Sequence, residues 1–92
     1  MPPCPLCGRE MIAGPSVDEH HWVPKSEGGR VSSRLHKVCH RALHARFTLA
    51  ELAGAFSTPE AVRQDEEMAR FIRWVRKRPP EYLDWPNDRR RE

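Results

Sequence analysis

The sequence predicts a small α+β domain, in which a β-hairpin and a helix form the first half and further helices form the second half. Three observations support this fold class. The chain has 92 residues, enough for one domain whose hydrophobic core alone would stabilise it only marginally. All of its cysteines and histidines lie within residues 4–44, and apolar residues repeat at helical spacing in the second half. We therefore expect a bound metal ion to staple the first half together.

Composition and charge exclude some classes of protein and favour others. The chain is 38% hydrophobic with a mean hydropathy of −0.78, and no apolar run is long enough to span a bilayer, so no membrane contact is expected. The first residues lack the charged and apolar regions of a secretory signal, which predicts a cytoplasmic protein with reduced thiols. The net charge of +3 comes from residues 1–47, which hold seven Lys or Arg against four acids, so a phosphate-bearing partner is expected.

The first half contains a turn, a hairpin and a helix in that order. Residues 2–8 are rich in Pro and Gly around Cys-x-x-Cys, which is typical of a zinc knuckle. The stretch His21–Val23 favours a strand that ends before Pro24, and Val31–Leu35 is the expected partner strand after a wide loop. A helix is expected from about Val38 to Phe47.

The second half is predicted to be helical. Apolar residues repeat from Leu49 up to Gly54, and Thr58-Pro59-Glu60 is typical of a helix start. Asp65 is expected to cap a further helix that ends before Pro79 and carries an apolar stripe. The stripe consists of Met68, Phe71, Ile72 and Val75. Basic residues at the end of this helix, from Arg73 to Arg78, are explained by the helix dipole.

These elements divide the chain into three parts. Residues 1–47 form the knuckle and core, and residues 48–86 form a helical extension packed on that core within the same domain. Residues 87–92 are polar and are expected to be a disordered tail.

Two pairs of residues in the first half have the spacing of tetrahedral zinc ligands. Cys4-x-x-Cys7 is followed by His36-x-x-Cys39, which supplies three sulfurs and one imidazole for a structural Zn²⁺. His40 is an alternative to His36 as the fourth ligand. The competing interpretation is that the cysteines are buried free thiols.

Four histidines are left after that assignment, namely His20, His21, His40 and His44. His40 and His44 lie one helical turn apart, so both rings can reach a common ion. His20 and His21 are adjacent on a strand and point to opposite faces, so one of them can join the ion while the other stays free as a general base. The competing interpretation is that these histidines are solvent-exposed or satisfied core residues.

This division of histidines is typical of a phosphodiesterase that uses one metal ion. A cation on three imidazoles leaves positions open for phosphate oxygens, and a free imidazole can take a proton from the attacking water. Ligation by nitrogen alone favours Zn²⁺, Ni²⁺, Co²⁺ or Mn²⁺ over Mg²⁺, which prefers oxygen.

At this point the sequence resembles a known family. The run from Asp18 to Gly29, DEHHWVPKSEGG, followed by His36-x-x-Cys39-His40-x-x-x-His44, is similar to the ββα-metal core of HNH endonucleases, and most similar to the subgroup with a zinc knuckle. The resemblance covers residues 4–46. It implies that the protein is a DNA endonuclease, a hydrolase of phosphodiester bonds, with a structural zinc ion and a catalytic divalent cation.

The resemblance also implies roles for single residues. His20, His40 and His44 would bind the catalytic cation, and His21 would be the general base. The middle residue of the family motif, usually Asn, corresponds here to Val31, whose side chain can neither bind metal nor hold the loop that orients the base. Ser32, Ser33 or backbone groups would then have to replace it.

Other residues near the motif are candidates for binding DNA or for supporting the metal ligands. Asp18 and Glu19 are more simply explained as solvated acids than as partners of the ligand histidines, and Trp22 as a core residue rather than a base-stacking one. Basic residues close to the motif are expected to contact DNA phosphates. They are Lys25, Arg30, Arg34, Lys37 and Arg41.

Two other functions remain open from the sequence. One is a non-catalytic, zinc-finger-like module that binds nucleic acid, and the other is a degenerate nuclease fold. The C-terminal helices leave room for a homodimer or a protein partner.

Overall fold

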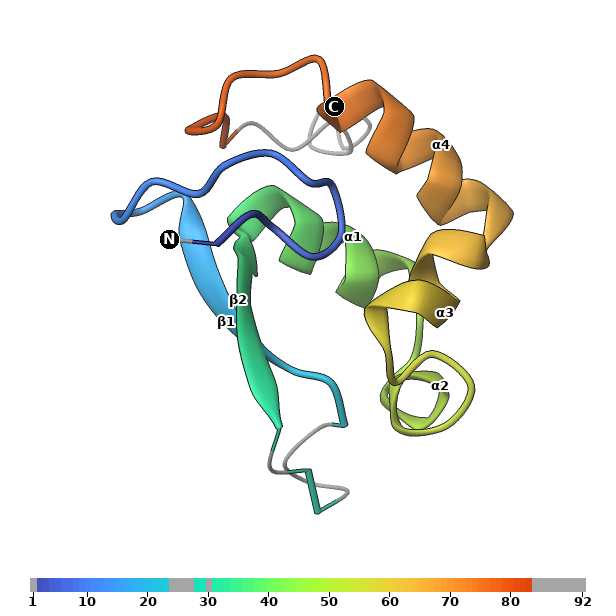
Figure 1. Cartoon of the computed structure of the whole chain (residues 1–92). Coiled ribbons are helices and arrows are strands. Elements are labelled where there is room, and N and C mark those ends of the chain that lie inside the picture. Colours follow the sequence, from blue (N-terminus) through green and yellow to red (C-terminus); the bar gives the residue numbers. More distant parts are fainter. Residues whose placement is uncertain (1, 24–27, 30, 84–92) are drawn as a thin grey trace, which may run out of the picture.

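The computed structural model describes residues 2–23, 28–29 and 31–83, and shows two strands followed by four helices (Figure 1). The elements are β1 (Val17–His21), β2 (Ser32–His36), α1 (Lys37–Arg46), α2 (Leu49–Ala53), α3 (Pro59–Gln64) and α4 (Glu66–Val75). The predicted α+β class is confirmed at this level. The segment expected to be a disordered tail, 87–92, lies outside the described residues.

The two strands form an antiparallel hairpin in which Asp18 lies opposite Leu35 and His20 opposite Ser33. The prediction of a strand over His21–Val23 was wrong, because β1 ends at His21. The strand was missed because Asp18 and His20 occupy its inward positions. Polar residues there hide the alternation of apolar and polar side chains by which a half-buried strand is recognised.

Helix α1 follows β2 without a connecting loop and packs against both strands (Figure 1). Its buried face consists of Val38, Cys39, Ala42 and Leu43. The expected helix over Val38–Phe47 is confirmed with both ends displaced by one residue. This face carries a metal-ligand candidate, Cys39, into the interior of the protein.

The predicted helix starts in the second half are confirmed, and each has a side-chain cap. Thr48 forms a capping box with Glu51, Thr58 accepts a hydrogen bond from the Ala61 N–H, and Asp65 accepts one from the Met68 N–H. These caps satisfy backbone N–H groups that have no partner within the helix. Helix α4 packs against α1 and α3. It lies on the upper right of the molecule in Figure 1.

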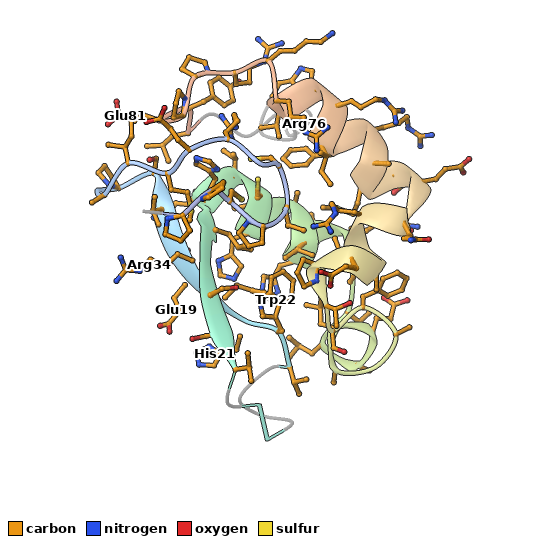
Figure 2. All side chains as sticks on the ribbon, in the orientation of Figure 1. Glu19, His21, Trp22, Arg34, Arg76 and Glu81 are labelled. Atoms are coloured by element: carbon orange, nitrogen blue, oxygen red, sulfur yellow. The ribbon has the colours of Figure 1, made fainter. Side chains whose placement is uncertain are left out.

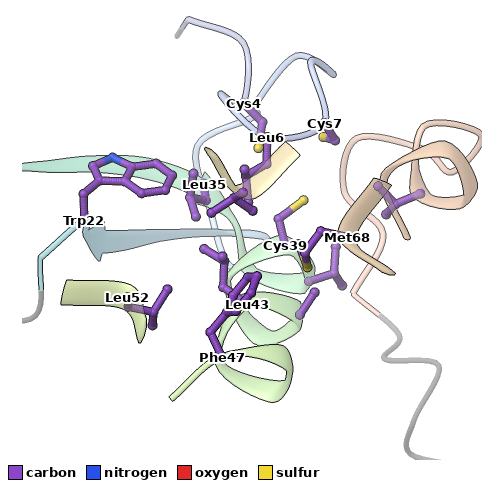
Figure 3. Packing of buried hydrophobic residues seen from close by; sticks show 14 of the residues in the cluster. Cys4, Leu6, Cys7, Trp22, Leu35, Cys39, Leu43, Phe47, Leu52 and Met68 are labelled. Atoms are coloured by element: carbon purple, nitrogen blue, oxygen red, sulfur yellow. The ribbon is translucent and has the colours of Figure 1, made fainter. Parts of the chain in front are cut away.

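A single hydrophobic core connects the hairpin, the N-terminal loop and the helices (Figure 3). Leu35, Leu43 and Leu52 are completely buried, and Trp22 is buried as predicted for a core residue. The knuckle cysteines belong to the same cluster, so the packing of the core and the geometry of the cysteines depend on each other. No described helix has the length and apolar character needed to cross a membrane.

Candidate metal centres

Three cysteines and one histidine meet in the interior of the protein. Cys4 and Cys7 come from the N-terminal loop, His36 from the end of β2 and Cys39 from the first turn of α1. All four are buried, and one ligand atom from each lies within 4.8 Å of the others. A buried Cys₃His set of this kind could hold a structural metal ion such as zinc.

The hydrogen bonds of His36 identify the nitrogen that faces the sulfurs. Its Nε2 lies 3.0 Å from the carbonyl oxygen of Glu10, which can only accept, so Nε2 carries the proton. Its Nδ1 lies 3.3 Å from Cys7 Sγ, so this nitrogen faces the cysteines and is the one that could bind a metal ion there. A metal-binding histidine commonly donates its other N–H in this way. The structure thus groups His36, and not the alternative His40, with the three cysteines.

The electrostatics of this cluster favour thiolates, the form that binds zinc, at Cys4 and Cys7, whereas hydrogen bonding with these two sulfurs and burial raise the pKa of the Cys39 thiol. Hydrogen bonding with Cys39 lowers the pKa of both the Cys4 and Cys7 thiols, and Cys7 also accepts from Arg9 Nε at 3.3 Å. Burial lowers the pKa of His36, but its hydrogen bonds with the Cys4 and Cys7 sulfurs outweigh burial and raise it to about 9. Proton-donating groups therefore surround two thiolates, and a bound cation would take the place of those protons.

Arginine side chains connect the knuckle to the C-terminal helices. Arg76 Nε donates to the Cys7 carbonyl oxygen at 2.8 Å, and Arg63 on α3 donates to the Pro5 carbonyl. Arg9 donates in the opposite direction, to the Arg78 carbonyl at 3.2 Å. Figure 2 shows Arg76 where α4 approaches the N-terminal loop. The helical second half thus holds the loop that presents two of the candidate zinc ligands.

A second cluster, of three histidines, lies between β1 and α1. His20 comes from β1, His40 and His44 come from successive turns of α1, and one ring nitrogen of each lies within 4.8 Å of the others. His40 Nε2 and His44 Nε2 are 3.2 Å apart. Two nitrogens bound to one zinc ion at tetrahedral angles would be about 3.3 Å apart, so this spacing fits a shared cation.

His20 carries an uncompensated polar atom in this cluster. The residue is only 2% exposed, and its Nε2 has no hydrogen-bond partner in the part of the chain that the structure describes. The edge of the ring meets Trp22, with 4.6 Å between the ring centroids. Burial lowers the pKa of His20 to about 4, and burial also lowers the pKa of His44, so both rings are neutral near pH 7. Neutral imidazole nitrogens are suited to bind a cation, and Nε2 of His20 has no competing partner among the described residues.

Asp18 supports this cluster, although the sequence favoured a solvated acid at that position. Its Oδ2 lies 3.0 Å from His40 Nδ1, and this hydrogen bond lowers the pKa of the Asp18 carboxyl. The carboxylate accepts the Nδ1 proton, so Nε2 of His40 is left to face His44. The signal available in the sequence was the spacing of Asp18 and His20, which puts both side chains on the same face of β1.

His21 lies on the opposite face of β1 from this cluster. It is half-buried near the end of the hairpin, and its cross-strand neighbour is Ser32 (Figure 2). The candidates for orienting it have other partners, because Ser32 donates to Glu19 and Ser33 accepts from Trp22. Within residues 2–23, 28–29 and 31–83, no side chain makes a hydrogen bond with the His21 ring. Its role as a base stays a prediction.

Three of the five basic residues near the motif lie in the part of the chain that the structure describes. Arg34 is exposed on the outer face of the hairpin, opposite Glu19 (Figure 2). Lys37 is half-buried at the start of α1, and Arg41 is exposed on α1 next to His40. Lys25 and Arg30 lie outside the described residues. Contacts of all five with DNA stay predictions.

A two-stranded sheet, four described helices and a buried Cys₃His cluster define a small α+β protein with a candidate structural metal site. The chain is 43% identical over 82 residues to the "Uncharacterized protein YisB" of Bacillus subtilis (strain 168), and the match covers 87% of this chain and 79% of that protein. The chain therefore belongs to the family of YisB. No family model matches the sequence. No solved structure gives a significant match either.

Proposed function

We propose that the protein is a metal-dependent DNA endonuclease of the HNH type. The observation that carries this proposal is the meeting of His20, His40 and His44 around one point, with a buried and unpartnered ring nitrogen on His20. The nearby Asp18–His40 hydrogen bond is typical of a supported metal ligand rather than of a solvated histidine. The resemblance of the surrounding sequence to the HNH motif supplies the reaction and the substrate.

Each residue of the cluster has a task in this proposal. His20, His40 and His44 would hold a divalent cation, and Asp18 would keep His40 in the tautomer that binds it. When bound, such a cation supplies stabilisation of the negative charge on the phosphate and on the leaving oxygen. Arg41, exposed beside His40, would attract the phosphate backbone.

His21 would take the proton from the attacking water. A general base has to be free of the cation and accessible to water, and His21 is outside the three-histidine cluster and only partly buried. An imidazole can hold that proton and pass it to solvent after the phosphodiester bond has broken.

A plasmid-cutting assay tests the proposal. Purified protein with zinc in the Cys₃His site is incubated with supercoiled DNA and Mn²⁺, Ni²⁺ or Zn²⁺, beside a chelator control. We expect nicking or cutting with at least one cation, and a loss of about 100-fold or more in rate for His21→Ala. Glu19→Gln, a change on the same strand and the same outer face, should cut at nearly the normal rate. No cutting by the wild-type protein with any of these cations would refute the proposal, and unchanged cutting by His21→Ala would refute the role of His21.

A degenerate nuclease fold is the second candidate, and one observation favours it. Val31, in the place of the usual Asn, is 71% exposed, and its apolar side chain can neither bind a metal ion nor hold the loop that orients the base. Such a protein would act as a protein-interaction domain and would bind the second cation without cutting DNA. A zinc-finger-like module would instead bind one ion per chain and no cation at His20, His40 and His44.

A further inference from the structure

The end of α4 carries a concentration of positive charge that the histidine cluster does not use. Residues 68–80 contain five Lys or Arg and no acid, whereas Asp65, Glu66 and Glu67 stand at the start of the helix. The helix dipole was expected to explain these cations, but its effect falls off within the last turn, and of the set from Arg73 to Arg78 only Arg73 lies in the last turn of α4. The dipole therefore does not account for the whole set.

Two adjoining clefts open along this part of the surface. One, of about 520 Å³, is lined by Arg73, Trp74, Arg76, Lys77 and Arg78. The other, of about 300 Å³, is lined by Arg63, Ala69, Ile72, Arg73 and Arg76. They share Arg73 and Arg76, and neither has an acidic residue among the described residues that line it. The clefts thus form one hollowed surface of a single sign of charge.

The cations of this surface differ in the contacts that they make within the protein. Arg76 holds the Cys7 carbonyl, and the Arg78 guanidinium lies 4.8 Å from the centre of the Trp74 ring. Arg73 and Lys77 are exposed and form no ion pair with any residue in the described ranges 2–23, 28–29 and 31–83. Arg73 lies in the last turn of α4 and Lys77 lies just beyond its end, and both line the larger cleft, where like charges repel each other. No ion pair within those ranges offsets this repulsion, so an anionic partner would relieve it.

We propose that this surface, lined by Arg73 and Lys77, is a second contact for the phosphate backbone of double-stranded DNA. Charge complementarity identifies the partner. Double-stranded DNA presents phosphates at regular spacing, and these match a surface that carries several exposed cations. Figure 2 shows Arg76 and His21 at opposite ends of the molecule, so the surface is separate from the end of the hairpin. The molecule is 33 Å in its longest dimension, and one duplex of about 20 base pairs is long enough to pass both regions. The choice of DNA rests on the proposed function.

Binding, rather than cutting, tests this proposal. The affinity of zinc-loaded protein for a labelled duplex of about 20 base pairs is measured by fluorescence anisotropy over a series of salt concentrations, with no other divalent cation added. Arg73→Gln and Lys77→Gln each remove one cleft cation, and glutamine keeps a good helix propensity. We expect each to weaken binding about tenfold near 0.1 M salt and to reduce the slope of log affinity against log salt by about one.

Arg70→Gln is the matched control, because Arg70 is exposed on the same helix and lines neither cleft. Equal effects of all three variants would overturn the proposal, since net charge alone would explain them. So would wild-type affinity in Arg73→Gln and Lys77→Gln, or equally tight binding of a single-stranded oligonucleotide. Thermal melting of both cleft variants should show no loss of stability. A protein that binds through this surface but never cuts would leave the inference standing and refute only the nuclease activity.

Discussion

Asp18 Oδ2 and His40 Nδ1 lie 3.0 Å apart, across the gap between β1 and α1. This contact joins residues that are 22 positions apart in the sequence. A carboxylate can only accept at neutral pH, so it fixes the proton on Nδ1 and turns the lone pair of Nε2 toward His44. A single hydrogen bond therefore prepares His40 as a ligand before any cation is present.

The Asp18 carboxylate is predicted to strengthen cation binding at the histidine cluster. Asp18→Asn should weaken the affinity of this cluster for Co²⁺ or Ni²⁺ by about 10- to 100-fold, because the amide no longer selects the His40 tautomer. The measurement is a titration of zinc-loaded protein followed by calorimetry or by the absorption of bound Co²⁺. Glu19→Gln, on the opposite face of β1, is the control and should keep the wild-type affinity. Equal affinities of Asp18→Asn and wild type would contradict the role given to Asp18.

The Cys₃His cluster is predicted to be needed for folding. Cys39 is completely buried within the core, and structural zinc supplies about 10–16 kcal/mol to the folding of small zinc domains. Cys39→Ser should therefore lose zinc and show no cooperative thermal transition by circular dichroism. His44→Ala, a change at the exposed edge of the other cluster, should keep both the zinc ion and the transition. Cooperative melting of zinc-free Cys39→Ser would show that the metal is not the staple.

Burial of His20 predicts a dependence of stability on pH. Its pKa is lowered to about 4, so as the pH falls the unfolded chain takes up the proton before the folded protein does. This contribution to stability is complete above about pH 6.5 and is lost as the pH falls toward 4, with a total of at most about 3 kcal/mol. Urea unfolding of the zinc-loaded protein between pH 7 and pH 5 measures it. In His20→Gln the free energy of unfolding should depend less steeply on pH. The same pH dependence in both proteins would contradict the role given to His20.

Asp65 is predicted to stabilise the second half through two contacts. Its carboxylate caps α4 at the Met68 N–H, at 3.1 Å, and pairs with two nitrogens of Arg46 at 2.9 Å each. Asp65→Ala removes both contacts and should lower the free energy of unfolding by about 1–2 kcal/mol. Asp65→Asn keeps the cap and should lose less. Arg46→Gln keeps the cap and removes the pair with Asp65 together with the ion pair between Arg46 and Glu67, at 3.2 Å. An Asp65→Asn variant as unstable as Asp65→Ala would show that the cap contributes little.

Local signals explain which parts of the fold the sequence predicted. Thr58-Pro59 and Asp65 are residue types that favour the N-terminus of a helix, and the structure has helices that begin at those positions. The first strand was misplaced because its inward residues, Asp18 and His20, are polar. The position of this strand depends on its pairing with β2, and that pairing cannot be predicted from a short stretch of sequence.

The same distinction holds for the metal centres. Cys4-x-x-Cys7 and His40-x-x-x-His44 are local patterns, and the structure brings the members of each together. The Asp18–His40 hydrogen bond and the attachment of Arg76 to the knuckle depend on the register of the hairpin and on the packing of α4. Contacts between distant segments of this kind require the folded structure.

The central claim is that the chain holds two metal ions, one in the Cys₃His cluster and one on His20, His40 and His44. Native mass spectrometry after loading with Zn²⁺ and removal of loosely bound ions tests it most directly. We expect two ions per wild-type chain and one per chain of His44→Ala, which should keep its fold. A single ion in both proteins would contradict the second site and, with it, the proposed nuclease.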